Sequence, residues 1–118
     1  MIEIRADQMS LFAARERETF VRRVMTYLRT QHEERLREFD DAQLQALVGR
    51  QISAAATYGI GAEADVVLFI EMSLAFGNDF HCSWRYPAAE RILNSSGDGT
   101  SKMQALLTAA QSGFEAQP

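Results

Sequence analysis

The chain has 118 residues, of which 47% are hydrophobic and 24% charged, and its formal net charge is -4. This length suits one domain with a buried core, and this composition excludes a disordered chain. The charges also argue against a nucleic-acid-binding surface, because residues 1–50 hold nine Arg and nine Asp or Glu, and residues 51–118 hold three basic and seven acidic residues. We predict a single domain over residues 1–118, with residues 1–5 and 115–118 frayed.

The cellular compartment is predicted from the cysteine content and the apolar stretches. The single cysteine, Cys82, cannot form a disulfide within the chain, so a secreted scaffold stapled by disulfides is not expected. Charges near the N-terminus, with no long apolar run after them, predict that no signal peptide is present. The longest apolar stretch, residues 64–76, contains Asp65 and Glu71 and is too short to span a membrane. We therefore expect a soluble, cytoplasmic protein.

The first predicted element is a long helix over residues 6–31, with Asp7 as a good N-cap. Hydrophobic residues at helical spacing form one face of this helix: Met9, Phe12, Phe20, Val24 and Leu28. At about 1.5 Å per residue, the helix is on the order of 39 Å long, which is as long as such a domain is wide. We therefore expect its end to project or to contact another molecule, and a two-fold contact through this helix would make a homodimer.

The opposite face of this first helix is locally basic. Only Glu16 and Glu18 lie close to its five arginines, which are Arg15, Arg17, Arg22, Arg23 and Arg29. A solvated face is the ordinary interpretation of such a pattern. The alternative is a surface that docks on an acidic partner, because the planar guanidinium pairs well with carboxylates.

Two helices are predicted after a charged connector at residues 32–38. Asp40 and Asp41 predict the start of a second helix that ends near Tyr58, with Gly59 in the left-handed position after it. The apolar face of the second helix consists of Leu44, Leu47, Val48, Ile52 and Ala55. A third, almost wholly apolar helix is predicted between Gly61 and Gly77, at the centre of the fold; a buried strand is the alternative, but the length and the glycines favour a helix.

The remaining elements are shorter. We expect residues 78–86 to be irregular, Pro87 to start a short helix through Leu93, and residues 94–99 to form a mobile loop. The last helix begins with Ser101 and Gln104 in capping-box spacing. Its apolar face consists of Met103, Leu106, Leu107, Ala110 and Phe114. These elements predict an all-α fold, a single small domain of four to five helices with a long N-terminal helix.

The sequence offers few residues for catalysis or metal binding. A zinc site needs about four ligands, whereas the chain has one cysteine and two histidines. We expect His81 to be exposed or hydrogen-bonded to Asp79, and Cys82 to be a buried or half-buried structural thiol, since no orienting group or oxyanion donor is evident. Glu71 is expected to pair with an arginine of the first helix. We therefore predict no catalytic, metal-binding or cofactor-binding residue, no cofactor and no enzyme activity.

Aromatic residues gather in and beside the irregular segment, namely Phe76, Phe80, Trp84 and Tyr86. Most residues in such a set fill the core, but Trp, Tyr and Arg dominate the energetics of protein interfaces. Trp84 is the best interface candidate. The predicted partner-binding residues are Arg15, Arg22, Arg23, Arg29, Asp79, Phe80, Trp84, Arg85 and Tyr86.

One pattern of residues covers somewhat over a third of the chain: Tyr58-Gly59-Ile60, Glu63, Asp65-Val66, Phe69, Met72, Gly77, Asp79-Phe80, Tyr86-Pro87, Ile92-Leu93 and Lys102-Met103. This pattern resembles a family of small, mostly uncharacterised bacterial proteins encoded among type VI secretion effector genes. Most of the matched residues are helix ends and core positions, so the pattern is more specific for fold than for activity. The resemblance implies an accessory role without catalysis, as an adaptor or co-chaperone that binds an effector-loading chaperone or the effector toxin.

The function predicted from these observations is a non-enzymatic protein-binding adaptor or co-chaperone in effector loading and export. The alternative is an immunity protein that blocks the active site of a cognate toxin with its acidic second half. A small enzyme or ligand-binding protein that uses Glu71, Asp79 and His81 is a third hypothesis. We expect another protein as the partner, and neither a nucleic acid nor a membrane.

Overall fold

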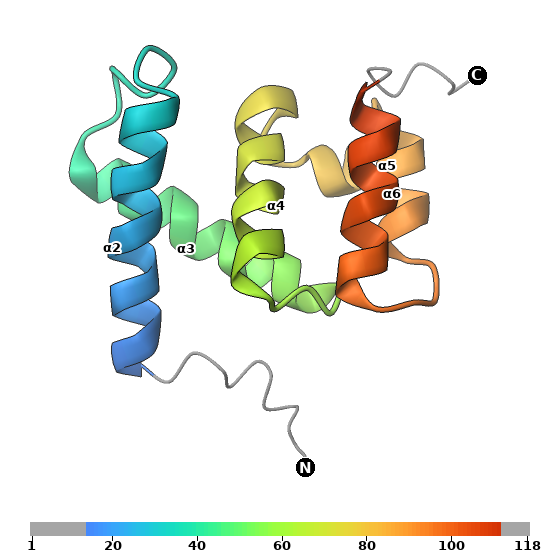
Figure 1. Cartoon of the computed structure of the whole chain (residues 1–118). Coiled ribbons are helices and arrows are strands. Elements are labelled where there is room, and N and C mark those ends of the chain that lie inside the picture. Colours follow the sequence, from blue (N-terminus) through green and yellow to red (C-terminus); the bar gives the residue numbers. More distant parts are fainter. Residues whose placement is uncertain (1–13, 112–118) are drawn as a thin grey trace. The chain divides into compact units, whose positions relative to one another are not determined.

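The computed structural model describes residues 14–111, with side chains from residue 16 onward, and this part of the chain is all-helical without strands (Figure 1). The predicted all-α fold class is therefore confirmed. The helices are α2 (Ala14–Gln31), α3 (Asp41–Thr57), α4 (Glu63–Phe76), the 3-10 turn η1 (Phe80–Cys82), α5 (Pro87–Leu93) and α6 (Gly99–Gln111).

Helix α2 spans Ala14–Gln31 and ends at the predicted residue, but the predicted length of the first helix stays a prediction. Its first eight predicted residues, 6–13, lie outside the described residues, as do Asp7, Met9 and Phe12. The predicted frayed tails and Phe114 also lie outside them.

The contacts between residues divide the described chain into two units, one up to Ser53 and one from Ala54 onward. The first unit contains α2, the connector and most of α3. The second unit contains the last turn of α3 and all later helices. Whether the chain behaves as a single domain in solution stays a prediction.

In the first unit, the apolar residues of α2 follow the predicted helical spacing. Phe20, Val24 and Leu28 are all buried, at 0–2% exposure. The chain then continues through hydrogen-bonded turns over residues 32–38, in which the Leu36 N–H donates to the His32 carbonyl at 3.0 Å. Leu36 is itself fully buried, so this charged connector is fixed to the core by one apolar side chain.

Helix α3 begins with a reciprocal pair of hydrogen bonds. The Gln43 N–H donates to Asp40 Oδ1 at 2.8 Å, and the Asp40 N–H donates to Gln43 Oε1 at 2.9 Å. This is a capping box, which satisfies two backbone donors that the helix itself leaves unpaired. The predicted apolar face is confirmed, because all of its five members are buried: Leu44, Leu47, Val48, Ile52 and Ala55.

Gly59 terminates α3 in the left-handed conformation that the sequence predicted, with φ at 80°. The Ile60 N–H donates to the Ala55 carbonyl and the Gly59 N–H to the Ala56 carbonyl, both at 3.0 Å. This pair of bonds is a Schellman motif, and it turns the chain so that Ile60 is buried at 1% exposure. The turn therefore ends the helix and also adds an apolar residue to the core.

Helix α4 is the most apolar element of the second unit. Only Glu63, Ala64 and Ala75 are exposed along its length, whereas Phe69 and Ile70 are fully buried. Gly77 ends it with φ at 111°, and the Gly77 N–H donates to the Ser73 carbonyl. The predicted helix, and not the alternative strand, is therefore confirmed for this segment.

Helix α5 runs from Pro87 to Leu93 as predicted, with Pro87 in its first turn. Helix α6 starts two residues earlier than predicted, and its cap is Asp98 and not Ser101. Asp98 Oδ1 accepts a hydrogen bond from the Ser101 N–H at 2.7 Å, and this bond is the main reason that the pKa of Asp98 is lowered. Met103 and Leu106 are buried, whereas Leu107 is 39% exposed and lies at the edge of the predicted apolar face.

The first turn of α6 contacts the residues between α3 and α4 and the first turn of α4. Lys102 Nζ donates to the Tyr58 carbonyl at 3.0 Å, and Thr100 Oγ1 donates to Asp65 Oδ2 at 2.7 Å. Gly99 approaches so closely that an added Cβ would lie 2.6 Å from the carbonyl oxygen of Gly59. These contacts bring together the beginning and the end of the pattern that carries the resemblance.

Candidate functional site

The candidate site is the turn between α4 and α5. After Gly77, the Phe80 N–H donates to the Gly77 carbonyl and the Cys82 N–H to the Asp79 carbonyl, which forms the single turn of η1. The Tyr86 N–H then donates to the Ser83 carbonyl at 3.1 Å. This hydrogen bond closes a β-turn over residues 83–86, whose two central residues are Trp84 and Arg85.

Trp84 projects from this β-turn into solvent. It is 84% exposed, compared with 41% for Tyr27 and 39% for Leu107, the other large hydrophobic residues recorded as exposed among the described ones. The guanidinium carbon of Arg85 lies 5.7 Å from the centre of the Trp84 ring, within the range of a cation–π interaction. The turn therefore presents an aromatic ring and a cation side by side.

The neighbouring predicted residues have different environments. Phe80 is 1% exposed and its ring centre lies 5.2 Å from that of Phe69, so it belongs to the core and is not accessible to a partner. Tyr86 is half-buried, with its ring edge-on to Phe76 at 5.4 Å. Phe80 and Tyr86 therefore flank Trp84 and Arg85 in sequence, and each packs against an aromatic ring of α4. Asp79 is exposed just before η1.

His81 does not take the partner that the sequence suggested. Its Nδ1 lies 3.0 Å from Tyr58 Oη, and the direction of this hydrogen bond depends on the imidazole tautomer. The rings of Tyr58, Phe69 and Phe80 all lie within 6 Å of the imidazole. Burial lowers the pKa of His81, and the charge of Asp79 opposes this shift.

Tyr58 forms the other half of this pair, and the sequence analysis did not predict it as a site residue. Burial raises the pKa of Tyr58, and the charges of Cys82 and Glu90 add to the shift. The phenol therefore stays protonated at neutral pH and can donate to a neutral imidazole. The pairing joins the end of α3 to η1 and fixes the segment that precedes Trp84.

Cys82 is exposed, so the prediction of a buried or half-buried thiol was wrong. The reason is the η1 turn, which directs Phe80 into the core and leaves the residue two positions later at the surface. Among the described residues, no three side chains of His, Cys, Asp or Glu gather closely enough to hold a metal ion. No helix within residues 14–111 combines the length and apolarity needed to cross a membrane.

The arginines of α2, in the first unit, differ in what they contact. Arg29 donates to the carbonyls of Leu36 and Phe39, both at 2.9 Å, and forms an ion pair with Asp41 at 3.0 Å. Arg17, similarly, donates to the Gly49 carbonyl at 3.1 Å. These two arginines therefore stabilise the first unit itself.

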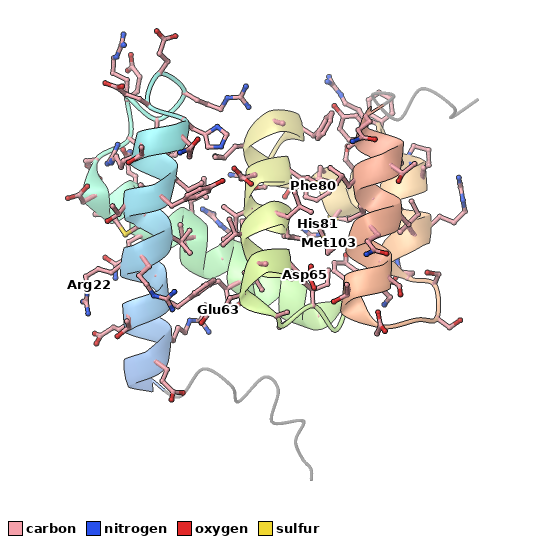
Figure 2. The ribbon with its side chains drawn as sticks, viewed as in Figure 1. Arg22, Glu63, Asp65, Phe80, His81 and Met103 are labelled. Carbon is pink, nitrogen blue, oxygen red and sulfur yellow. The ribbon has the colours of Figure 1, made fainter. Side chains whose placement is uncertain are left out.

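Arg22 and Arg23 are the exposed members of the predicted basic face. Arg22 projects away from the helix (Figure 2), and the guanidinium of Arg23 lies 5.7 Å from the centre of the Phe20 ring. The side chain of Arg15 lies outside the described residues. Within the described part of α2, the apolar residues Phe20, Val24 and Leu28 are buried, and the exposed side chains include Arg23 and Tyr27. The predicted homodimer through this helix stays a prediction.

Sequence reasoning also missed a groove on the second unit. It has a volume of about 380 Å³ and lies where the end of α5 meets the beginning of α6. Its lining consists of Arg91, Ile92, Ser95, Ser96, Ser101, Lys102 and Ala105. The residues come from two helices and a loop, so only the return of α6 beside α5 assembles them, and no local pattern reveals the groove.

Comparison of the chain with protein-family models, with curated proteins and with solved structures finds no match.

Proposed function

We propose that this chain is a non-enzymatic protein-binding adaptor or co-chaperone that assists effector loading and export in a bacterial type VI secretion system. The setting comes from the resemblance of the pattern over residues 58–103. The partner in this proposal is an effector-loading chaperone or the effector itself, and the compartment is the cytoplasm.

The observation that carries the proposal is the exposure of Trp84. A folded chain loses favourable burial energy when it leaves an indole ring in water, and a tryptophan beside an arginine is typical of the residues that dominate protein interfaces. Phe80 and Tyr86, which precede and follow Trp84 in sequence, pack against aromatic residues of α4. The turn that carries the exposed ring is therefore anchored to α4. A partner with an apolar pocket and a carboxylate nearby would match Trp84 and Arg85.

Arg22 is the strongest candidate for a second contact. Its side chain is exposed, and its guanidinium makes no hydrogen bond or ion pair with any of the described residues. Exposed charges at the rim of an interface mainly change the association rate and its dependence on salt. We therefore expect Arg22 to contribute less to affinity than Trp84.

The binding test compares Trp84→Ala with Leu107→Ala, which removes another exposed apolar side chain of the second unit. The affinity-tagged full chain is used to capture an effector-loading chaperone and an effector from a cell with an active type VI system. Trp84→Ala should weaken capture by about 30-fold, as expected for an interface hot spot, and Leu107→Ala should leave it nearly unchanged. Equal capture by both variants would reject Trp84 as the anchor.

A genetic test separates the proposed function from the immunity alternative. Deletion of the gene should abolish export of the effector while the producing cell stays healthy. Death of the deletion strain only in the presence of a cognate toxin would instead identify an immunity protein. The Trp84→Ala allele should reproduce the export defect, provided that the variant accumulates to the same level as the wild type.

A further inference from the structure

The groove between α5 and α6 is mainly apolar inside and basic at two positions. Its volume of about 380 Å³ falls in the range of sites that hold a small ligand or a few side chains. Ile92 and Ala105 contribute apolar surface to it, and Arg91 and Lys102 contribute the two cations. None of its seven lining residues is acidic.

The charge of the residues that line this groove is opposite to the net charge of the second half of the chain. Residues 51–118 contain seven acidic residues and only three basic ones, which are Arg85, Arg91 and Lys102. Two of these three cations therefore line the same groove. The Asp98 carboxylate lies beside this lining, because it accepts a hydrogen bond from the Ser101 N–H. Two basic side chains against this one carboxylate favour a ligand that carries a small number of negative charges.

The two cations are also positioned differently. Lys102 Nζ is held by the Tyr58 carbonyl at 3.0 Å, which occupies one of the three donors of the ammonium group. Arg91 is exposed, and its guanidinium forms no hydrogen bond or ion pair with any of the described residues. The groove therefore has one anchored cation and one cation that is available for a bidentate bond to a carboxylate.

We propose that this groove binds an acidic peptide segment of the protein partner, with an apolar side chain between Ile92 and Ala105 and neighbouring carboxylates paired with Arg91 and Lys102. This inference rests on the proposed function in one respect, which is that the ligand belongs to a protein partner. The acidic charge of the second half disfavours polyanions such as nucleic acids, whereas a short segment experiences mainly the local positive charge. The apolar walls favour a peptide over an isolated anion such as phosphate.

The test uses the full-length chain labelled with ¹⁵N and a pentapeptide amide in which a leucine is followed by two aspartates. The peptide should shift the backbone amide signals of residues 91–105 in a saturable way. Two matched peptides should each bind about tenfold more weakly. One has asparagines in place of the aspartates and loses the charge pairing, and the other has alanine in place of the leucine and loses the apolar contact.

The variant that tests the groove is Arg91→Glu, and its control is Arg50→Glu. Both arginines are exposed and both substitutions change the net charge by the same amount, but Arg50 lies in the first unit. Arg91→Glu should weaken peptide binding by about tenfold or more, and Arg50→Glu should change it by less than about twofold. Unchanged circular dichroism and an unchanged melting temperature would show that both variants remain folded.

Three outcomes would overturn the inference: no saturable shift at residues 91–105 at millimolar peptide, equal loss of binding in both variants, or shifts by inorganic phosphate that match those of the peptide. The last outcome would indicate an anion site that does not recognise the apolar side chain. Peptide binding is measured without the partner protein, so failure of the groove leaves the result for Trp84 unaffected. Failure of partner capture with intact peptide binding would reject the proposed function and retain the groove.

Discussion

Arg29 in the first unit and Lys102 in the second unit both bind backbone carbonyls, but over different distances in sequence. The first unit also has one longer contact of this kind, from Arg17 to the Gly49 carbonyl 32 residues away. In the first unit, Arg29 reaches Leu36, Phe39 and Asp41, which lie only seven to twelve residues further along. In the second unit, Lys102 reaches the Tyr58 carbonyl from 44 residues away. The Arg29 contacts hold the connector between α2 and α3, and the Lys102 contact joins the beginning of the second unit to its last helix.

Two further polar contacts of the second unit also join residues that are far apart in sequence. Thr100 and Asp65 are 35 residues apart, and Tyr58 and His81 are 23 residues apart. Contacts between distant residues form only after long loops have closed, which costs more chain entropy than local contacts do. We therefore expect substitutions at the docking point of α6 to affect the whole second unit, and those at Arg29 to act mainly on the connector.

The largest effect is expected for Gly99→Ala. The new Cβ would lie 2.6 Å from the Gly59 carbonyl oxygen and 2.9 Å from Ile60 Cα, and neither backbone atom can move away easily. The free energy of unfolding should fall by about 2–3 kcal/mol. The control is Gly49→Ala in α3, whose Cβ meets only Arg17 Nη2 at 3.9 Å and which should stabilise the chain by about 0.5–1 kcal/mol. Urea unfolding followed by circular dichroism measures both, and equal values for the two variants would contradict the close packing at Gly99.

A smaller loss is expected for Arg29→Met, which keeps the apolar stem and removes the guanidinium. Two carbonyls lose a charged donor, so the free energy of unfolding should fall by about 2 kcal/mol. Asp41→Asn should cost less than about 1 kcal/mol, because Asp41 is 87% exposed and surface ion pairs are weak. If Asp41→Asn proved as costly as Arg29→Met, the ion pair and not the carbonyl contacts would fix the connector.

Lys102→Met should lower the free energy of unfolding by about 1 kcal/mol, since it removes one hydrogen bond to the Tyr58 carbonyl. Arg91→Met is the matched control in the same unit, because its guanidinium makes no hydrogen bond or ion pair with residues of the described part. Chemical unfolding of both variants provides the comparison. An equal effect of the two substitutions would mean that the long-range contact of Lys102 adds no stability.

The smallest effect is a pH dependence that arises from His81. Its pKa in the folded chain is lowered below the ordinary value of 6.5, so the unfolded chain binds the proton more readily. The stabilisation from neutral His81 is therefore complete above pH 6.5 and is lost as the pH falls toward the folded-state pKa. Stability should decrease more between pH 7.5 and about pH 5 in the wild type than in His81→Gln. Parallel pH profiles for the two proteins would show that His81 is not responsible.

Much of the fold was predictable from local patterns. The apolar spacing of α3, the glycines at 59 and 77 and the proline at 87 each act within a few residues, and the structure confirms the helix ends that they predict. The start of α6 was predicted wrongly because Asp98 and Ser101 are both residue types that can cap the start of a helix. The packing of Gly99 against Gly59 favours the earlier start, and that contact is not encoded locally.

The residues of the candidate site were predictable from the sequence, but which of their side chains are exposed was not. Phe80 and Trp84 are both aromatic and stand four residues apart, yet one is 1% and the other 84% exposed. The η1 turn and the β-turn at residues 83–86 determine which ring enters the core. The same turns place Cys82 at the surface, and the groove at Arg91 depends on two helices that meet only in the folded chain.

Trp84 is the only tryptophan in the sequence, which gives its exposure a spectroscopic consequence. Its indole already contacts water in the folded chain, so its fluorescence should change little on unfolding, and global stability is better followed by circular dichroism. A partner that covers the ring would instead shift the emission to shorter wavelength. The intrinsic fluorescence of this chain therefore reports on binding at a single residue, without any added label.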